Sequence, residues 1–343
     1  MRASLRNAAI SAATFVAGWP PSMSIVSSID TVPAYVRRPA APSRYRPRMR
    51  LGQIGAWCAA FTVASADDAR PAAAEIEALG YETLWYPEGL GTRESFTNAA
   101  VLLAATDRIR ICSGIANIWA RDAVSTANAA RVLADAFDDR FLLGLGVSHP
   151  RQVDPRGHLY RRPVATMRAY LEAMDHDPFV SPDGTAVTRP PVRRVLAALR
   201  PPMLRLAAEM ALGAHTFLVP VEHTRRAREI LGPEPLLVVE QKVVLGDDLA
   251  EARDRARSAL GWYLDTPNYV DNLRWLGFSE DDLAGGGSDT LAQALVVAGD
   301  EAAIEERCRQ HLDAGASQVA IQPLEAGDPF GRETFRRLAP VLL

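Results

Sequence analysis

The chain has 343 residues, of which 48% are hydrophobic and 23% charged, a composition typical of a globular protein with one large α/β domain or two small ones. The formal net charge of −3 argues against a nucleic acid or an acidic membrane surface as a partner. The three cysteines, Cys58, Cys112 and Cys308, are widely separated, so neither a disulfide framework nor a zinc site is indicated. We therefore expect a cytoplasmic protein without a metal site.

The first 50 residues differ in kind from the rest of the chain. They hold eight arginines and one acidic residue, Asp30, a charge of +7, whereas the other 293 residues carry 30 basic minus 40 acidic groups, or −10. Their Ala, Ser, Pro and Arg show no periodic apolar face, so we expect residues 1–48 to be a disordered extension. Two early arginines before a short apolar stretch also allow a secretory signal. We favour instead a translation start at Met49, with a mis-assigned leader before it and the globular domain over 49–343.

From Leu51 onward, apolar segments of strand length alternate with segments of helix length. The predicted strands cover 51–57, 83–87, 108–119, 141–146, 193–198, 214–219, 236–245 and 317–324. The predicted helices cover 67–79, 96–105, 124–137, 163–174, 202–210, 222–231, 248–262 and 300–314. Eight nearly continuous apolar strands that alternate with helices predict an α/β fold, a parallel (β/α)8 TIM barrel, with a doubly wound open sheet as the alternative. Residues 263–298 are expected to form an insertion before the last helix and strand.

The fourth predicted strand ends in Gly144-Leu145-Gly146 and is followed at once by Ser148 and His149. Alternate glycines let the backbone approach a flat or charged group and leave room for it at the mouth of a barrel. A dinucleotide-binding fingerprint is excluded, because the third glycine is missing and the prolines that follow prevent the required helix. The stretch therefore predicts a site, with tight packing around two glycines as the alternative.

In a TIM barrel the chemistry lies where strands end, so the side chains just after the predicted strands are candidate site residues. They are Trp57, Glu88, Asn117, Trp119, Ser148, His149 and Arg200. Among them, the two tryptophans are expected to contact the substrate. Glu240, Gln241 and Lys242 interrupt an apolar strand before its end, so we expect them to form a structural network in the lower barrel. Cys112 has no indicated histidine partner and is expected in the core.

Several motifs occur in an order that carries a family resemblance: LGYETLWYPEG, ATDRIRICSGIANIWARDAV, RFLLGLGVSHP, RGHLYRRPVATMRAYLEAM, VLAALRPPMLRLAAEMALGAH and AREILGP. Over residues 50–325 the chain resembles the luciferase-like monooxygenase superfamily, and most of all the actinobacterial branch that uses the deazaflavin coenzyme F420. The almost exclusive use of arginine, with Lys242 the only lysine, fits a high-GC actinobacterial source. The resemblance implies a luciferase-like barrel, an oxidoreductase and a homodimer.

The resemblance also implies where the flat redox ring of the cofactor lies. In the superfamily the third strand carries a bulge with a non-proline cis peptide that backs this ring, and Gly114 and Ile115 match it here. The cofactor-binding residues that the resemblance implies are Gly114, Ile115, Asn117, Gly146, Ser148, Leu199 and Arg200. The phosphate loop departs from the family pattern, because Pro201 and Pro202 remove two amide donors. Arg200 is expected to supply charge-assisted hydrogen bonds in their place.

His149 falls where related enzymes place a proton donor near the reacting carbon, and an imidazole that titrates near neutrality suits that role. Glu88 is the second catalytic candidate, because Gly89 stands where several relatives have a histidine. These residues predict hydride transfer between F420 and a small organic substrate, which the sequence does not name. Two alternatives stay open: an FMN-dependent monooxygenase that uses O2, and a catalytically silent flavin-binding barrel.

Overall fold

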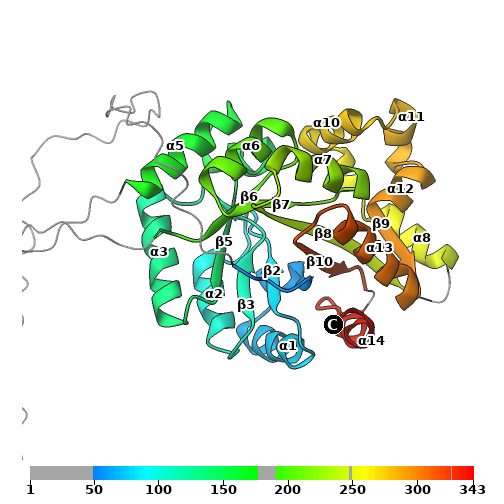
Figure 1. Ribbon diagram of the computed structural model, residues 1–343, viewed down its shortest axis with the longest axis horizontal. Helices are drawn as coiled ribbons and strands as arrows, with labels where there is room; N and C mark the ends of the chain where they lie inside the picture. The colour runs from blue at the N-terminus through cyan, green and yellow to red at the C-terminus, as the bar shows by residue number, and fades with distance from the viewer. Residues whose placement is uncertain (1–48, 177–190, 247–248, 326) are drawn as a thin grey trace, which may run out of the picture. The chain divides into compact units, whose positions relative to one another are not determined.

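The computed structural model describes residues 49–176, 191–246, 249–325 and 327–343 (Figure 1). The predicted extension 1–48 lies outside the described residues, so its expected disorder stays a prediction. No helix in the described ranges is long and apolar enough to cross a membrane.

Eight parallel strands form a closed ring. In ring order they are β1 (Ile54–Trp57), β2 (Thr83–Tyr86), β3 (Arg110–Ser113), β5 (Phe141–Gly146), β6 (Arg194–Ala197), β7 (Gly213–Thr216), β8 (Leu236–Leu245) and β10 (Gln318–Pro323). Strand β10 closes the ring, because it pairs with β1 through Ile54↔Val319 and with β8 through Gln318↔Val238. The predicted TIM barrel is confirmed, and the open sheet is wrong.

Helices surround the ring, so each strand is buried on both faces (Figure 1). They are α1 (Ala66–Ala78), α2 (Ser95–Leu103), α3 (Ala123–Ala136), α4 (Pro150–Val153), α5 (Pro163–Asp175), α6 (Pro201–Met210), α7 (Val221–Leu231), α8 (Leu249–Ser258), α13 (Glu301–Asp313) and α14 (Arg332–Leu342), with short 3-10 turns η1 (Ala59–Thr62) and η2 (Asp154–Arg156). Ser65, Asp122 and Asp300 cap α1, α3 and α13 by accepting a backbone N–H of the first turn. Helix α14, which the sequence analysis did not predict, follows β10 and completes the eighth unit.

The predicted insertion is mostly helical. It holds α9 (Gly261–Leu264), α10 (Pro267–Leu276), α11 (Glu280–Leu283), the turn η3 (Ala284–Gly286) and α12 (Asp289–Leu295), and ends in the strand β9 (Val296–Gly299). Strand β9 pairs with the second half of β8, from Lys242 to Leu245, whereas β7 pairs with the first part, from Leu236 to Val239. The prediction missed β9, because four apolar residues directly after a helix resemble the last turn of that helix.

The third predicted strand, 108–119, is broken in two. Strand β3 ends at Ser113 and β4 covers Ala116–Asn117, and the Gly114–Ile115 peptide bond between them is cis. Strand β3 pairs with the beginning of β5, whereas β4 pairs with its end. The bulge with a cis peptide is therefore present at the two residues that the family resemblance implied.

A layer of apolar side chains fills the interior of the barrel and includes Trp57 at the end of β1. Its members are Leu51, Trp57, Trp85, Cys112, Leu142, Val195, Leu212, Val238 and Ala320. Lys242 is buried above this layer, where its Nζ donates to Glu240 Oε1 at 3.0 Å and to Gln322 Oε1 at 2.9 Å. Of the expected network, Glu240 and Lys242 are joined, whereas the Gln241 side chain bonds the Leu295 carbonyl and His311 instead. The expected place in the lower barrel is wrong, because β8 is ten residues long and Lys242 lies in its upper half.

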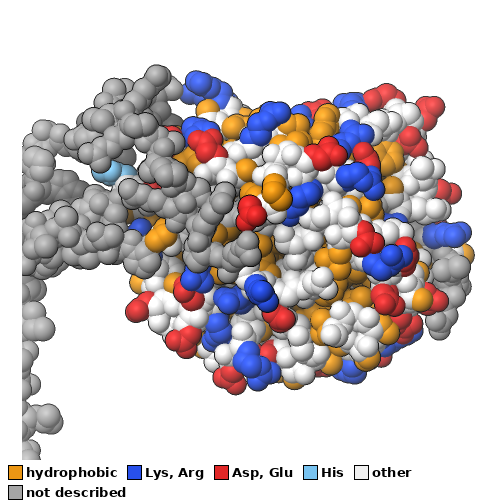
Figure 2. Space-filling view, viewed as in Figure 1, with side chains coloured by type: hydrophobic (Ala, Val, Ile, Leu, Met, Phe, Trp, Pro, Cys, Tyr) orange, Lys and Arg blue, Asp and Glu red, His pale blue; other side chains and the backbone are white. Residues whose placement is uncertain are grey.

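Acidic and basic side chains are interspersed over the face shown in Figure 2. Exposed ion pairs are common among the described residues, as between Arg274 Nε and Glu280 Oε1 at 2.6 Å. The described part of this face therefore presents no large patch of one charge.

Candidate active site

A cavity of about 690 Å³ lies at the carboxyl ends of the barrel strands, a volume typical of sites for small molecules. Among the residues that line it are these predicted site residues: Trp57, Glu88, Gly114, Ile115, Gly146, Ser148, His149, Leu199 and Arg200. The barrel thus brings together side chains from five of its strand ends. The described residues include no cluster of three or more His, Cys, Asp or Glu that would hold a metal ion.

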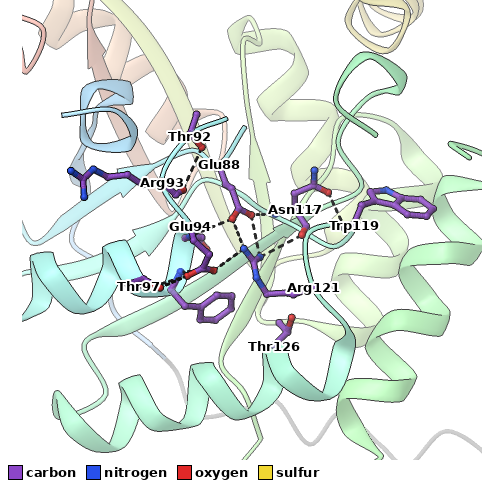
Figure 3. A network of polar contacts seen from close by, with 12 residues as sticks. Glu88, Thr92, Arg93, Glu94, Thr97, Asn117, Trp119, Arg121 and Thr126 are labelled. Atoms are coloured by element: carbon purple, nitrogen blue, oxygen red, sulfur yellow. Dashed lines mark hydrogen bonds and ion pairs between the residues drawn. The ribbon is translucent and has the colours of Figure 1, made fainter. Parts of the chain in front are cut away.

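Asn117 and Trp119 lie outside the lining that the described residues form. The Asn117 Oδ1 accepts the backbone N–H of Trp119 at 3.0 Å, which fixes the turn after β4 (Figure 3). The Trp119 indole N–H donates to the Val147 carbonyl at 2.9 Å, and its ring packs 5.4 Å from the His158 ring. The structure therefore does not place Trp119 against a substrate or Asn117 against a ring in this cavity, because local contacts hold both side chains in the loop.

The two glycines at the end of β5 accommodate the bulge of the third strand. A Cβ on Gly144 would lie 2.0 Å from the Ser113 carbonyl oxygen, and one on Gly146 would lie 2.3 Å from Ile115 Cδ1. The Ser113 hydroxyl also donates to the Gly144 carbonyl and accepts its N–H, both at 2.9 Å. The expectation that both glycines leave room at the mouth is therefore corrected: the room is filled by Ser113 and Ile115, although Gly146 still lines the cavity.

The Glu88 carboxylate is buried at the cavity wall, with 4% of its side chain exposed (Figure 3). It accepts hydrogen bonds from the Arg121 guanidinium, from the Asn117 N–H at 2.8 Å and from the Ser95 N–H at 3.1 Å. The Glu88 N–H in turn donates to the Ile115 carbonyl at 3.2 Å. Glu88 therefore clamps the bulge on both sides, with both carboxylate oxygens engaged.

Arg121 is the cation of this network, and the sequence analysis missed it. It also lies 2.7 Å from Glu94 Oε1. Burial disfavours the charged guanidinium, but hydrogen bonding and charge attraction from Glu88 and Glu94 outweigh burial and raise the pKa of Arg121. In a chain so rich in arginine, this position carries no sequence signal of its own.

His149 lies between the end of β5 and α4, half-buried against aromatic rings. Its ring centre is 5.3 Å from that of Tyr269 and 5.9 Å from that of Trp262. Its Nδ1 is buried and has no hydrogen-bond partner among the described residues. Burial lowers the pKa of His149 to about 4, so the imidazole is uncharged at neutral pH. The preceding Ser148 has φ 59°, which turns the chain at the cavity rim.

Much of the cavity wall is aromatic and comes from the segment after β7 and from the insertion. Its members are Phe217, Trp262, Tyr263, Tyr269 and Trp275. The sequence analysis missed this wall, although a signal existed: residues 262–275 hold four aromatic residues in a chain that is 7% aromatic. The insertion therefore supplies much of the cavity wall.

Arg200 lies at the rim of the cavity, where it precedes the two prolines that open α6. Its Nη1 is 3.4 Å from Asp271 Oδ2, and its Nη2 is 3.2 Å from Asn268 Oδ1. The guanidinium thus ties the rim to α10, with 42% of the side chain exposed to an incoming anion.

Residues 42–318 match the sequence model of a family described as luciferase-like monooxygenase. The chain belongs to this family. A monooxygenase family is one of oxidoreductases, so the predicted enzyme class and the predicted family are both confirmed.

Two relatives of this luciferase-like protein were compared by sequence. A stretch of 132 residues is 32% identical to a protein of Mycobacterium tuberculosis named "Putative coenzyme F420-dependent oxidoreductase Rv3520c", and covers 36% of this chain and 35% of that protein. Over 293 residues the chain is 23% identical to a 5,10-methylenetetrahydromethanopterin reductase of Methanolobus tindarius, with 74% and 88% covered. The chain thus spans about a third of the first relative and most of the second.

Solved structures share the fold of the luciferase-like barrel at 14% identity. The coenzyme F420-dependent tetrahydromethanopterin reductase of Methanopyrus kandleri has a TM-score of 0.70, with 85% of this chain and 100% of that chain covered. An F420-dependent secondary alcohol dehydrogenase in complex with an F420-acetone adduct has a TM-score of 0.68, with 86% and 100% covered. The oxygenating constituent of 3,6-diketocamphane monooxygenase from Pseudomonas putida, in complex with FMN, has a TM-score of 0.64, with 85% and 97% covered.

Proposed function

We propose that this luciferase-like protein is an F420-dependent oxidoreductase that transfers a hydride between the deazaflavin and a small organic substrate. The observation that carries the proposal is the cavity at the barrel mouth, one wall of which is the bulge of the third strand at Gly114 and Ile115. The names of both sequence relatives, one F420-dependent and one a reductase, support the same chemistry. We also propose that the protein is a cytoplasmic homodimer, which light scattering tests through its mass.

The residues present fit a flat heterocyclic ring. A Cβ at position 114 would lie 2.8 Å from the Trp57 indole nitrogen and 3.1 Å from His215 Nε2, so glycine lets these two side chains pack against the bulge. Ile115 and Gly146 continue the same wall. We propose that the ring is held by Gly114, Ile115 and Gly146 together with Ser148 and Leu199. Arg200, at the rim, is proposed to face the anionic tail of the cofactor.

F420, when bound, supplies two-electron hydride chemistry. The chain positions the ring through its bulge, and the aromatic wall excludes water from the reacting atoms. Burial leaves the His149 imidazole uncharged at neutral pH, so the expectation of a proton donor that titrates near neutrality is corrected. His149 is proposed instead as a base that takes up a proton at the cavity rim. Glu88 is the other predicted catalytic residue, but both of its carboxylate oxygens already accept hydrogen bonds from the protein. We therefore propose that Glu88 is a positioning residue that holds the bulge.

Titration of the chain from Met49 onward with F420 and with FMN, followed by fluorescence, tests the choice of cofactor. We expect F420 to bind. Binding of FMN alone would overturn the choice and favour the O2-using monooxygenase, and F420 binding without turnover on a panel of alcohols, ketones and enones would favour a silent flavin-binding barrel.

His149→Gln tests the acid–base role. General acid–base groups contribute about 10²- to 10⁴-fold, so we expect kcat to fall at least about 100-fold with little change in F420 affinity. His158→Gln is the matched control, because His158 packs on Trp119 away from the cavity. Unchanged turnover in His149→Gln would remove the proposed role.

A further inference from the structure

Two buried nitrogens converge at the deep end of the cavity. They are the indole Nε1 of Trp57, at the end of β1, and the imidazole Nε2 of His215, on β7. Trp57 is 3% exposed and His215 2% exposed, yet both line the cavity. A Cβ on Gly114 would lie 2.8 Å from the first nitrogen and 3.1 Å from the second, so both nitrogens lie close to one point beside Gly114.

Neither nitrogen has a hydrogen-bond partner among the described residues, and so neither bonds the other. Buried polar groups in folded proteins are nearly always paired, so an unpaired pair that faces a cavity indicates a ligand atom between them. The sequence analysis proposed Trp57 for substrate contact and missed His215, which stands in the unremarkable sequence GAHT.

Contacts with neighbouring side chains and backbone hold both rings in place. The His215 ring lies 4.8 Å from the Trp85 ring, and its Nδ1 is 3.3 Å from the Val238 carbonyl oxygen. The Trp57 ring packs 5.2 Å from the ring of Phe217. The two nitrogens are therefore positioned by the barrel core before any ligand arrives.

The two nitrogens have opposite hydrogen-bonding roles. A carbonyl oxygen only accepts, so the contact with Val238 requires the proton on Nδ1 of His215 and leaves Nε2 as an acceptor in the neutral ring. Burial lowers the pKa of His215 to about 4, so the neutral ring is the form present at pH 7. The Trp57 indole N–H only donates. The subsite thus offers one donor and one acceptor side by side.

We propose that Trp57 and His215 form a subsite for the hydroxyl group of an alcohol substrate. The indole N–H donates to the hydroxyl oxygen, and His215 Nε2 accepts the hydroxyl hydrogen. A ketone only accepts, so it pairs with Trp57 and leaves Nε2 buried and unpaired. This inference rests on the proposed function and narrows its substrate class to alcohols. The ketone product of such an alcohol makes only one of the two hydrogen bonds that the subsite offers.

The test measures dissociation constants of cyclohexanol and cyclohexanone, which match in size, for the protein with and without F420. We expect the wild-type protein to bind the alcohol at least about tenfold more tightly, since the ketone leaves a buried acceptor unpaired. Trp57→Phe and His215→Phe should each bring this ratio close to one while the F420 dissociation constant changes less than about threefold. Trp119→Phe is the matched control, because it removes an indole N–H that bonds Val147 outside the cavity, and it should keep the ratio.

A wild-type ratio below about two, or a ratio that neither variant changes, would overturn the subsite. If the variants weaken F420 binding tenfold and leave the ratio intact, the pair binds the donor–acceptor edge of the cofactor ring and the assignment to substrate is wrong. His215→Gln replaces His215→Phe if the latter does not fold, as judged by its urea midpoint. Failure of the wild-type protein to bind F420 counts against the proposed function alone, because the alcohol ratio is also measured without cofactor.

Discussion

Glu88→Gln is the sharpest probe of the network that holds the bulge. The amide keeps the shape of the carboxylate but replaces one acceptor oxygen with a donor, which would face the N–H groups of Arg121, Asn117 or Ser95. Removing one partner of a buried ion pair costs about 3–5 kcal/mol. Arg121 keeps Glu94 at 2.7 Å, so we expect the lower end, a loss of about 3 kcal/mol in the free energy of unfolding.

Urea titration followed by circular dichroism measures this loss. The control is Glu209→Gln, since the Arg168–Glu209 pair is exposed (40% and 46%) and should contribute less than about 1 kcal/mol. Because the Glu88 carboxylate also accepts the backbone N–H of Asn117, just beyond the bulge, we expect F420 affinity to fall about tenfold in Glu88→Gln and to stay unchanged in the control. A Glu88→Gln protein as stable as Glu209→Gln would refute the reasoning.

Three further predictions concern stability. Gly144→Ala should cost about 2–4 kcal/mol or prevent folding, because the new Cβ meets the backbone oxygen of Ser113 at 2.0 Å, whereas Gly261→Ala, with open space around it, should be neutral in the same urea assay. Lys242→Met should cost about 3 kcal/mol by leaving the buried Glu240 without its cation, and the double variant Glu240→Gln/Lys242→Met should recover part of that loss. Burial lowers the pKa values of four histidines from 6.5, to about 4 in three cases and about 3 in the fourth. The unfolded chain therefore binds more protons below pH 6.5, and stability is lost as pH falls from there toward 4. The groups responsible are His149, His215, His223 and His311, so the slope should approach about 5 kcal/mol per pH unit. Urea midpoints that stay constant between pH 7 and 5 would contradict this prediction.

The strands of the ring could be predicted because each has a recognisable pattern in its own local sequence. Parallel strands are buried on both faces, so each is a short apolar run that stands out between helices, and all eight ring strands were found. The sequence analysis failed at β9, where four apolar residues follow α12 directly, and at α14, which it did not predict. These elements depend on what they pack against rather than on a pattern of their own.

By itself, the sequence determined the barrel, the family and the position of the bulge at Gly114 and Ile115, because these depend on local periodicity and on ordered motifs. Only the tertiary structure decided which side chains reach the cavity. Before the bulge Cys112 pairs with Leu142, an offset of 30, and after it Ala116 pairs with Leu145, an offset of 29. A register shift of one residue changes which face a side chain occupies, so the orientation of residues beyond the bulge does not follow from counting along the strand. The partners of Glu88 and the acceptor at His215 likewise come from distant segments that meet only in the closed barrel.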